Sequence, residues 1–337
     1  MFRNITVSCS PHISKPLSTR SVMLDVIIGL APAMLAAGYY FRIHAVALIA
    51  ACVVSCAATE WVCNVIRKKS NSLDDLSAVV TGIILALSMP PALPVWAAII
   101  GSVFSIAIGK MVFGGLGANI FNPAMVGRTF LAVSFGSLMT TWMVPATIDP
   151  AMSKIAQENA IDVRTQATPL AWSKMAIKNE LGADIYARQQ FGATFTGQVG
   201  GCLGETSAIA LLVGGLYLLL RRTISFHTPL AVLASALAFV SIAYFIDSDA
   251  YVQPFFHLTS GGLLMCAFFI ATDPVTAPLT RRGMWLFGIG VGGITMLIRV
   301  VGEYPEGVMY AVLIMNGFTP LIDRLFKVLP KGGKPNV

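Results

Sequence analysis

The sequence predicts an all-α integral membrane protein with about ten transmembrane helices, arranged as two inverted five-helix repeats joined by a long periplasmic segment. Three observations lead to this fold class. Of the 337 residues, 56% are hydrophobic and only 12% are charged, whereas a soluble domain carries about 25% charged residues. The mean hydropathy is +0.75. The positive charges fall between the apolar runs, as orientation in a bilayer requires.

The apolar runs are predicted to be spans because a helix needs about 20 apolar residues to cross the hydrocarbon, or fewer where it is broken or buried. The first five lie near residues 22–41, 45–66, 76–89, 94–112 and 124–144. The second five lie near residues 203–220, 228–246, 255–272, 284–301 and 306–325. The segment between the two sets is too polar and too interrupted to span.

The same pattern divides the chain into five parts. They are a tail at 1–20, a first repeat at 21–145, a polar segment at 146–202, a second repeat at 203–326 and a tail at 327–337. No small-residue cleavage signal ends the first apolar run, so we expect a retained span there and not a signal peptide.

The charges at the ends of the runs set the orientation. Arg67–Lys69, Arg221–Arg222, Arg281–Arg282 and the basic C-terminal tail all fall on the side of the N-terminus. The opposite short loops are acidic, with Arg42 as the main exception. By the positive-inside rule, both termini are cytoplasmic and residues 146–202 lie outside. The net charge of +7 does not indicate a nucleic-acid partner, because no basic patch is interleaved with aromatic residues.

An odd number of spans in each half requires the halves to be inverted relative to each other. A short sequence echo supports this: Ser88–Pro94 and Thr272–Pro278 each have a hydroxyl residue followed by prolines four apart. Proline removes a backbone donor and ends helices, so each motif marks an interrupted or abruptly stopped helix. Inverted repeats with broken helices are typical of many transport folds.

The most informative motif lies in the polar segment, where Asp162 to Thr168 reads D-x-x-T-x-A-T, with Thr165 and Ala167 at the other fixed positions. This is close to the pattern by which a flavin transferase attaches FMN, through its phosphate, to a threonine hydroxyl. Gln166 stands where that pattern has glycine. A nearby Gly192-Ala193-Thr194 lacks the acidic and hydroxyl residues upstream, so Thr168 is the better candidate.

The residue before a proline is biased towards extended backbone, so we expect Thr168 to be extended and exposed ahead of Pro169. A modifying enzyme needs that geometry to reach the hydroxyl. The alternative is purely structural, with Asp162 capping a turn.

A glycine-rich stretch, Gly200–Ser207, is expected to open the sixth span on the same face as Thr168. Glycines permit close backbone approach, and free N–H groups at a helix start bind phosphate. Gly204, Glu205 and Thr206 are therefore candidates near the FMN. The alternative is a capped helix start with glycines for packing.

A second glycine-rich stretch, Phe113–Pro123, joins the fourth and fifth spans at the cytoplasmic face. It lacks the third glycine and the preceding strand of a dinucleotide site. Asn119 and Asn122 offer amides that pair with the edge of a heterocycle, or else they satisfy helix ends. Asp273 is expected at the same level, after Phe268 and Phe269, and it could simply cap the break before Pro274.

Ionisable residues within apolar spans are costly in lipid and normally face a partner or a wet cavity. Asp25, Glu60 and Arg128 are of this kind, and structural pairing and an ion path both remain open. Cys52 and Cys56 lack the paired spacings of a zinc or iron–sulfur site, so the cysteines are expected to pack and no metal site is predicted.

Taken together, these motifs resemble the D subunit of the bacterial Rnf (Rsx) electron-transport complex, which is related to the B subunit of the sodium-pumping NADH:quinone oxidoreductase. The matching pieces run in order through most of the chain: Ser10–His12, Gly117–Ala124, Asp162–Thr168, Leu203–Ser207 and Ala271–Pro274. Only about 20 residues precede the first span, whereas the quinone-reducing relative carries a longer extension, which favours the Rnf type.

The resemblance implies a multi-pass subunit of a bacterial inner membrane with covalent FMN at Thr168 on the periplasmic side. It also implies non-covalent riboflavin near the cytoplasmic side, at Asn119, Asn122, Phe269 and Asp273. The implied activity is a ferredoxin:NAD⁺ oxidoreductase coupled to Na⁺ or H⁺ transport and carried out only by the whole complex.

The implied partners are membrane lipid, a periplasmic flavin transferase, iron–sulfur subunits and a second FMN-bearing subunit. Two alternatives stay open: the quinone-reductase subunit, and a cofactor-free inverted-repeat transporter or channel.

Overall fold

The computed structural model describes residues 18–143, 168–171, 192, 194–195, 199–247, 251–302 and 306–326. The elements of the first half are α1 (Thr19–Ile66), η1 (Leu73–Asp75), α2 (Ser77–Leu87), α3 (Val95–Ile106), η2 (Ala107–Met111), α4 (Pro123–Ser134) and α5 (Gly136–Met139). Those of the second half are α9 (Ala208–Leu220), α10 (His227–Ile246), α11 (Pro254–Thr259), α12 (Leu263–Met265), η3 (Cys266–Ile270), α13 (Arg281–Val300) and α14 (Val308–Leu325).

The chain is a membrane protein by the length and composition of its helices. Among the described residues, four helices are long and apolar enough to cross a bilayer, namely α1, α10, α13 and α14. Helices α2 and α9, and α3 together with η2, are apolar but shorter. Large apolar side chains face outwards, and Phe245 at the end of α10 is 86% exposed. Such a surface is stable in lipid and not in water.

Helix α1 contains the first two predicted spans in one element. Its regular geometry is interrupted only at Arg42, where φ is 50° and ψ is −127°. A non-glycine residue with positive φ is uncommon, and this one separates the two arms of the helix. The predicted loop between the spans is therefore reduced to a kink at a single residue.

Helix α2 is a half-length helix, as the proline motif after it predicts. At about 1.5 Å per residue its 11 residues rise about 16 Å, roughly half of the hydrocarbon thickness. Pro90 and Pro91 have no N–H, so the last carbonyls of the helix find other partners: the N–H of Leu203 donates to Met89 O at 3.0 Å, and that of Gly204 donates to Leu87 O at 2.7 Å.

Two other predicted spans are interrupted at points that were not predicted, near Gly136 and at Ser260-Gly261-Gly262. The expected helix at 124–144 ends at Ser134, because Phe135 leaves the helical region before α5 begins. The expected helix at 255–272 is divided into α11, α12 and the π-helical η3. Its break lies at Ser260–Gly262, where Gly261 has φ +72°, and not only at the proline motif that follows.

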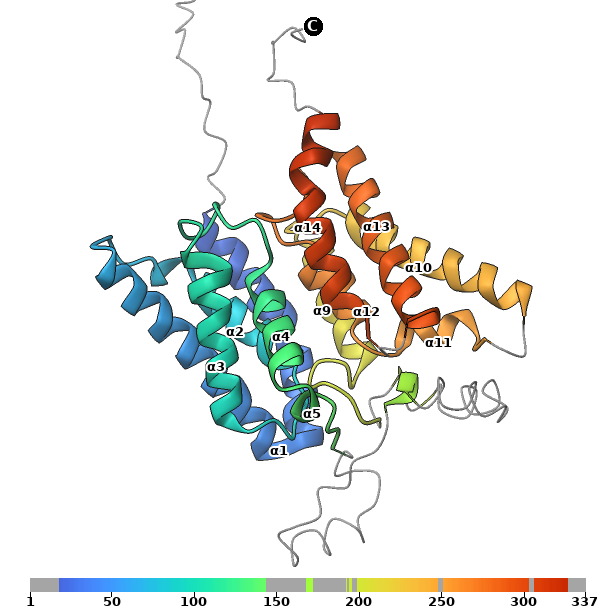
Figure 1. Ribbon diagram of the computed structural model, residues 1–337, viewed down its shortest axis with the longest axis horizontal. Helices are drawn as coiled ribbons and strands as arrows, with labels where there is room; N and C mark the ends of the chain where they lie inside the picture. Colours follow the sequence, from blue (N-terminus) through green and yellow to red (C-terminus); the bar gives the residue numbers. More distant parts are fainter. Residues whose placement is uncertain are drawn as a thin grey trace, which may run out of the picture.

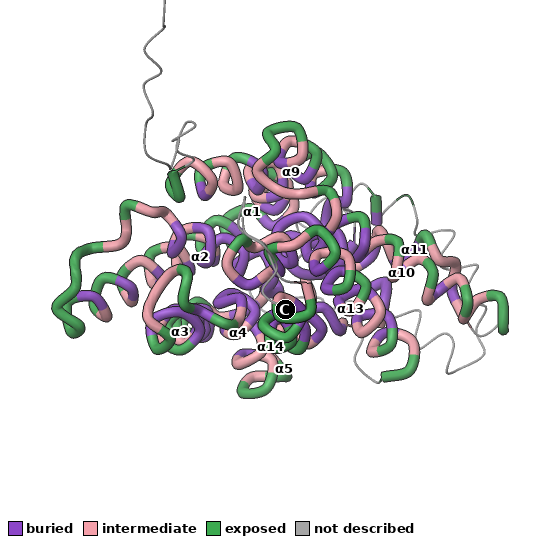
Figure 2. The backbone as a smooth tube through the Cα atoms, turned by 90° about the horizontal axis from the view of Figure 1, so that it is seen from above, coloured by how far each residue is buried: buried purple, intermediate pink, exposed green. Residues whose placement is uncertain are grey.

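The helices form two groups, α1–α5 and α9–α14 (Figure 1). They meet where α1 packs against α9 and α4 packs against α14. The first contact is a close glycine crossing, since a Cβ on Gly214 would lie 1.9 Å from the carbonyl oxygen of Gly29. Buried residues are concentrated where the groups meet, and exposed residues follow the outer helices (Figure 2).

The start of α1 and the end of α14 lie at one edge of the bundle, and the described segment 168–171 lies at the other (Figure 1). The charge pattern predicts that both chain ends lie on one side of the membrane and Thr168 on the other. In the structure, the start of α1 and the end of α14 do lie opposite the segment that contains Thr168 (Figure 1).

Candidate functional site

The structure has two cavities that contain predicted site residues. The first, which we call the Thr168 cavity, has a volume of about 330 Å³. Its wall is formed by α4, α5, segment 168–171, the 199–207 segment, the α11–α12 break and the start of α14. Ligand pockets are typically about 300–1,000 Å³, so this cavity is large enough for a small cofactor.

Thr168 lies on the wall of this cavity, but it is not exposed as the sequence predicts. Its side chain is only 8% exposed. The Oγ1 atom accepts a hydrogen bond from the N–H of Ala171 at 3.1 Å, as an N-cap residue does. The prediction of exposure was wrong because a helical turn begins at Pro169 and residues 168–170 are buried together against the cavity wall. Asp162, Thr165 and Ala167 lie outside the described residues.

A buried charge cluster forms one side of the Thr168 cavity. Arg128 of α4 donates from Nη2 to Glu306 Oε2 at 2.6 Å, and its Nη1 lies 3.8 Å from Glu205 Oε1. Glu306 Oε1 accepts the N–H of Gly262 at 2.7 Å and lies 3.6 Å from Arg299 Nη2. Arg128 thus has the structural partners that its place in an apolar span requires.

Some polar atoms at this cavity have no hydrogen-bond partner within the described residues. Among the described atoms, Arg128 Nε and Ser260 Oγ are buried without a hydrogen-bond partner. Buried polar atoms are normally satisfied, so these atoms favour a polar ligand beside them.

The ligand-type atoms of Cys202, Glu205 and Glu306 lie within 4.8 Å of one another. Arg128 Nη2 also lies 3.4 Å from Cys202 Sγ, so the positive charge that these groups need is already present. This cluster is an ion-pair network and does not require a metal.

The 199–207 segment differs from its prediction as a helix start with free N–H groups. Helix α9 begins at Ala208 and is capped by Ser207 Oγ, which accepts from Ala210 N at 3.3 Å. The N–H groups of Leu203 and Gly204 are used by the end of α2. The N–H groups of Leu203 and Gly204 are therefore not free to bind a phosphate, whereas Gly200 and Gly201 of the same segment line the Thr168 cavity.

The three residues of this segment that were predicted to lie near FMN occupy different positions in the structure. Glu205 lines the Thr168 cavity. Gly204 packs against Leu87, where an added Cβ would lie 2.9 Å from Leu87 Cβ. Thr206 is buried and donates from Oγ1 to Leu203 O at 3.2 Å. Gly204 and Thr206 thus support the wall, and only Glu205 faces the space.

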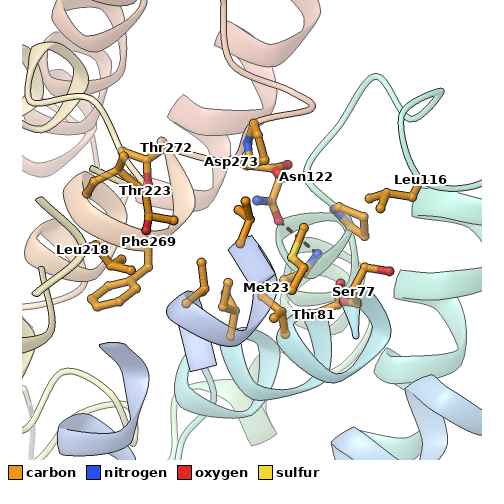
Figure 3. Close-up of a pocket in the computed structure, with 18 of the residues that line it drawn as sticks. Met23, Ser77, Thr81, Leu116, Asn122, Leu218, Thr223, Phe269, Thr272 and Asp273 are labelled. Atoms are coloured by element: carbon orange, nitrogen blue, oxygen red, sulfur yellow. Dashed lines mark hydrogen bonds between the residues drawn. The ribbon is translucent and has the colours of Figure 1, made fainter. Parts of the chain in front are cut away.

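The second cavity, which we call the Asp273 cavity, brings together all four residues predicted for riboflavin. Asn119, Asn122, Phe269 and Asp273 line it, although they come from segments about 150 residues apart in the sequence. Asn122 and Asp273 lie at the centre of the view in Figure 3, with Phe269 to one side. The sequence could place these residues at one membrane level, and the structure places them in one cavity.

The alternative role of the polar residues in this cavity is to cap helix ends or breaks, and the structure distinguishes them in this respect. Asn122 caps α4, and its Oδ1 accepts from Ala124 N at 3.1 Å and Met125 N at 3.3 Å. Asp273 Oδ2 accepts from Thr276 Oγ1 at 2.9 Å ahead of the proline turn. Asn119 Oδ1 is buried without a partner among the described residues. Of the three, Asn119 is therefore the residue whose side-chain oxygen is most available to accept a hydrogen bond from a ligand.

The size of the Asp273 cavity does not match a flavin in this conformation. Its volume is about 60 Å³, well below the roughly 300 Å³ of small ligand pockets. The donors and acceptors fit a heterocycle edge, but the three-ring system does not fit unless neighbouring side chains move. Burial raises the pKa of the Asp273 carboxyl above its ordinary value of 3.8, although hydrogen bonds from Thr276 and Val275 oppose this rise.

Helix α4 links the two cavities. Asn122 at its N-cap lines the Asp273 cavity, whereas Arg128 and Ala132 line the Thr168 cavity. The ten residues from Asn122 to Ala132 span about 15 Å at 1.5 Å per residue. The two candidate sites are therefore held a fixed, short distance apart by one rigid element.

Sequence reasoning missed several residues of the Thr168 cavity. The charge pattern places Glu306 only in an acidic loop, and Ser260 and Tyr310 belong to no motif. They reach the site through the break in the α11–α12 region and the start of α14. Arg128 is the one available signal, because a buried arginine in an apolar run requires an acidic partner nearby.

Comparison with known proteins gives one consistent result. The model of the NQR2, RnfD, RnfE family matches residues 6–331. The D subunit of the Na(+)-translocating ferredoxin:NAD(+) oxidoreductase complex of Acetobacterium woodii is 43% identical over 96% of this chain and 94% of its own length. The D subunit of the proton-translocating ferredoxin:NAD(+) oxidoreductase complex of Clostridium ljungdahlii is 38% identical, over 95% of this chain and 93% of its own.

A third relative, the D subunit of the ion-translocating oxidoreductase complex of Stutzerimonas stutzeri, is 38% identical over 95% of each chain. The similarity thus extends through both helix groups and the segment between them.

Proposed function

The chain belongs to the NQR2, RnfD, RnfE family, and from this membership we propose that it is the membrane D subunit of an ion-translocating ferredoxin:NAD⁺ oxidoreductase complex. In this proposal the protein relays electrons through FMN attached to Thr168. The flavin supplies the redox chemistry when bound, and the protein supplies position and electrostatics. The other subunits bring ferredoxin and NAD⁺ chemistry, because the cysteines here lack the spacing of a cluster site.

One observation carries the proposal: Thr168 lines a cavity of about 330 Å³ that a buried arginine, Arg128, also lines. Arg128 provides a fixed positive charge, and its Nε is unused among the described atoms. Glu205 and Glu306 hold the guanidinium in place. Met139, Trp142 and Met309 form apolar parts of the wall and exclude water from a bound cofactor.

Riboflavin in the Asp273 cavity remains a prediction from the resemblance. It is supported by the presence of all four predicted residues in one cavity. The cavity volume of about 60 Å³ is too small for riboflavin in this conformation. Acid extraction of the purified complex, followed by chromatography of the released flavin, tests it directly.

The inverted-repeat architecture is supported by equivalent features in the two halves. Leu76, with φ 62°, precedes the buried α2, and Gly261, with φ 72°, precedes the buried α12–η3 helix. The contacts between halves also correspond, because the first element of each half (α1 with α9) and the helix that begins the fifth predicted span of each half (α4 with α14) pack together. Ten crossings, with both termini cytoplasmic and segment 146–202 periplasmic, follow from this symmetry and the charge pattern.

The transported ion is not decided by kinship. One relative, 43% identical, is named Na(+)-translocating, and another, 38% identical, is named proton-translocating. Ion uptake into liposomes that contain the whole complex distinguishes the two.

In-gel ultraviolet fluorescence of the denatured protein, co-expressed with a flavin transferase, tests the covalent flavin. We expect a fluorescent band in the wild type that is lost in Thr168→Ala. Thr194→Ala is the matched control because Thr194 is a second buried threonine on the same cavity wall, and it should keep the band. A dark wild-type band would instead favour a cofactor-free transporter.

A further inference from the structure

Lys110 is a buried cation that the flavin chemistry does not use. It lies on the π-helical segment η2 and is 1% exposed. Its Nζ donates to both oxygens of Glu60, at 2.9 and 2.7 Å, and to Ser77 Oγ at 2.6 Å. π-Helical segments inside helices occur frequently at functional sites.

The hydrogen bonds continue from Lys110 to the loop that follows α1. Ser77 Oγ donates to Asp75 Oδ1, and Asp75 is only half-buried. On the other branch, Ser72 Oγ donates to Glu60 Oε1 and accepts from Asn64 Nδ2 at 2.8 Å. Both branches therefore end at the loop 67–76, whose first residues are exposed.

The other end of this network opens into the Asp273 cavity. Lys110 and Ser77 both line that cavity. A cavity of about 60 Å³ is too small for a flavin but holds water, which needs about 10–15 Å³ of such volume per molecule and polar partners. An unbroken chain of hydrogen-bonding groups thus connects the loop to a space suited to water.

Stability alone does not explain this arrangement. A buried ion pair often contributes no more than an apolar replacement would. Intramembrane ionisable groups that form chains are characteristic of proton relays.

We propose that Asp75, Ser77 and Lys110, with Glu60 as the counter-charge, form a proton relay between the loop 67–76 and the Asp273 cavity. Asp75 first takes one proton from water at the loop. Lys110 Nζ then gives a proton to cavity water and takes the proton of Ser77 Oγ, while Ser77 takes the proton from Asp75, so that one proton moves, all three groups return to their starting state and no electron is transferred. The relay rests on the proposed function in that electron transfer in the complex drives it, and it requires water, not riboflavin, beside Lys110 in the Asp273 cavity.

The charged and titratable groups around Lys110 come from several elements. Glu60 and Cys56 face it from α1, and Asp75 lies beyond Ser77. Asp273 lines the same cavity from the end of η3. Glu60 is the counter-charge nearest to Lys110, with Oε2 2.7 Å from Nζ.

The test uses the whole complex in liposomes, driven by reduced ferredoxin and NAD⁺, with proton uptake followed by a pH-indicator dye. Lys110→Arg keeps the charge and the ion pair but cannot release a proton. Ser77→Ala removes the middle link without changing any charge. Ser105→Ala is the matched control, because Ser105 is also a buried serine, but it donates only to Pro123 O, at 2.7 Å, and does not line the cavity.

We expect proton uptake to slow by at least about tenfold in Lys110→Arg and Ser77→Ala. The thermal midpoint and the covalent flavin band of both variants, and proton uptake in the control, should match the wild type. Unchanged uptake in both variants overturns the relay, as does a wild-type complex that takes up Na⁺ without protons. Loss of the wild-type flavin band would refute the proposed cofactor instead, and the dye measurement is independent of that band.

Discussion

Arg128 is the residue on which the Thr168 cavity depends most. It contacts Glu306 of the second helix group from α4 of the first, and it lies close to Glu205 and Cys202. Removing one partner of a buried ion pair leaves an uncompensated charge and costs about 3–5 kcal/mol. The guanidinium of Arg128 therefore both forms part of the cavity wall and joins the two helix groups.

We predict that Arg128→Met lowers the free energy of unfolding by about 3–5 kcal/mol, seen as a large fall of the thermal midpoint in detergent. Arg221→Met is the control because Arg221 pairs with Asp25 at 3.2 Å while its own side chain is 59% exposed. Exposed pairs contribute about 0–1 kcal/mol. Equal shifts in the two variants would contradict the buried network.

Asp273 is expected to make the free energy of unfolding of the protein depend on pH. Its pKa is raised by burial, so the folded state holds this proton more tightly than the unfolded chain. Its contribution to stability therefore decreases as the pH rises from 3.8 through the raised folded-state value.

Asp273→Asn should remove that part of the pH dependence, so that the difference in midpoint between variant and wild type grows in favour of the variant as pH increases. Thermal unfolding at a series of pH values measures this, with the exposed Asp74→Asn as a control for loss of a carboxylate. A constant difference at all pH values would show that Asp273 does not titrate in this way.

At the scale of elements, close helix crossings hold the two groups together. Gly214 of α9 crosses Gly29 of α1 so closely that an added Cβ would lie 1.9 Å from a backbone oxygen. Small residues at such crossings let helices approach in membranes. By contrast, a Cβ on Gly293 of α13 would have no neighbour within 4 Å.

Gly214→Ala should therefore destabilise the protein by about 1–3 kcal/mol through overpacking. Gly293→Ala should be neutral or stabilise by up to about 1 kcal/mol through helix propensity. The two midpoints, measured side by side in detergent, separate packing from propensity. Similar midpoints would mean that the α1–α9 crossing can relax at no cost.

Much of the element order could be predicted from the sequence because apolar runs of the right length show where helices lie. The half-length α2 followed from its proline motif. The breaks at Phe135 and Gly261 were not predicted, although Gly136 with its serine neighbours and the Ser260-Gly261-Gly262 run are turn signals in the sequence. These breaks depend on tertiary contacts, such as the bond from Gly262 N to Glu306.

At the scale of the whole molecule, the sequence predicts which face each candidate residue occupies but not which residues share a cavity. The motif alone identifies Thr168, whereas its burial depends on segments far away in the chain. Glu306 illustrates the limit, because its acidic character suggests only a loop, whereas its geometry places it against Arg128. Pairings of this kind require the three-dimensional packing.

The orientation of the chain gives a further prediction. Asn71 follows α1 and Ser137 lies in α5, and both are exposed. In intact cells, a membrane-impermeant thiol reagent should label Ser137→Cys and not Asn71→Cys. The wild type provides the background, because its described cysteines are buried except for half-buried Cys63. Labelling of Asn71→Cys alone would reverse the proposed topology.

The burial of Thr168 has a consequence for biogenesis. In the packed structure the side chain is almost enclosed and its oxygen already accepts the N–H of Ala171. If FMN is attached to this oxygen, as we propose, the attaching enzyme must reach it before Thr168 is packed in this way. Under that proposal cofactor loading precedes the final packing of this residue, and the maturation of the protein has an obligatory order.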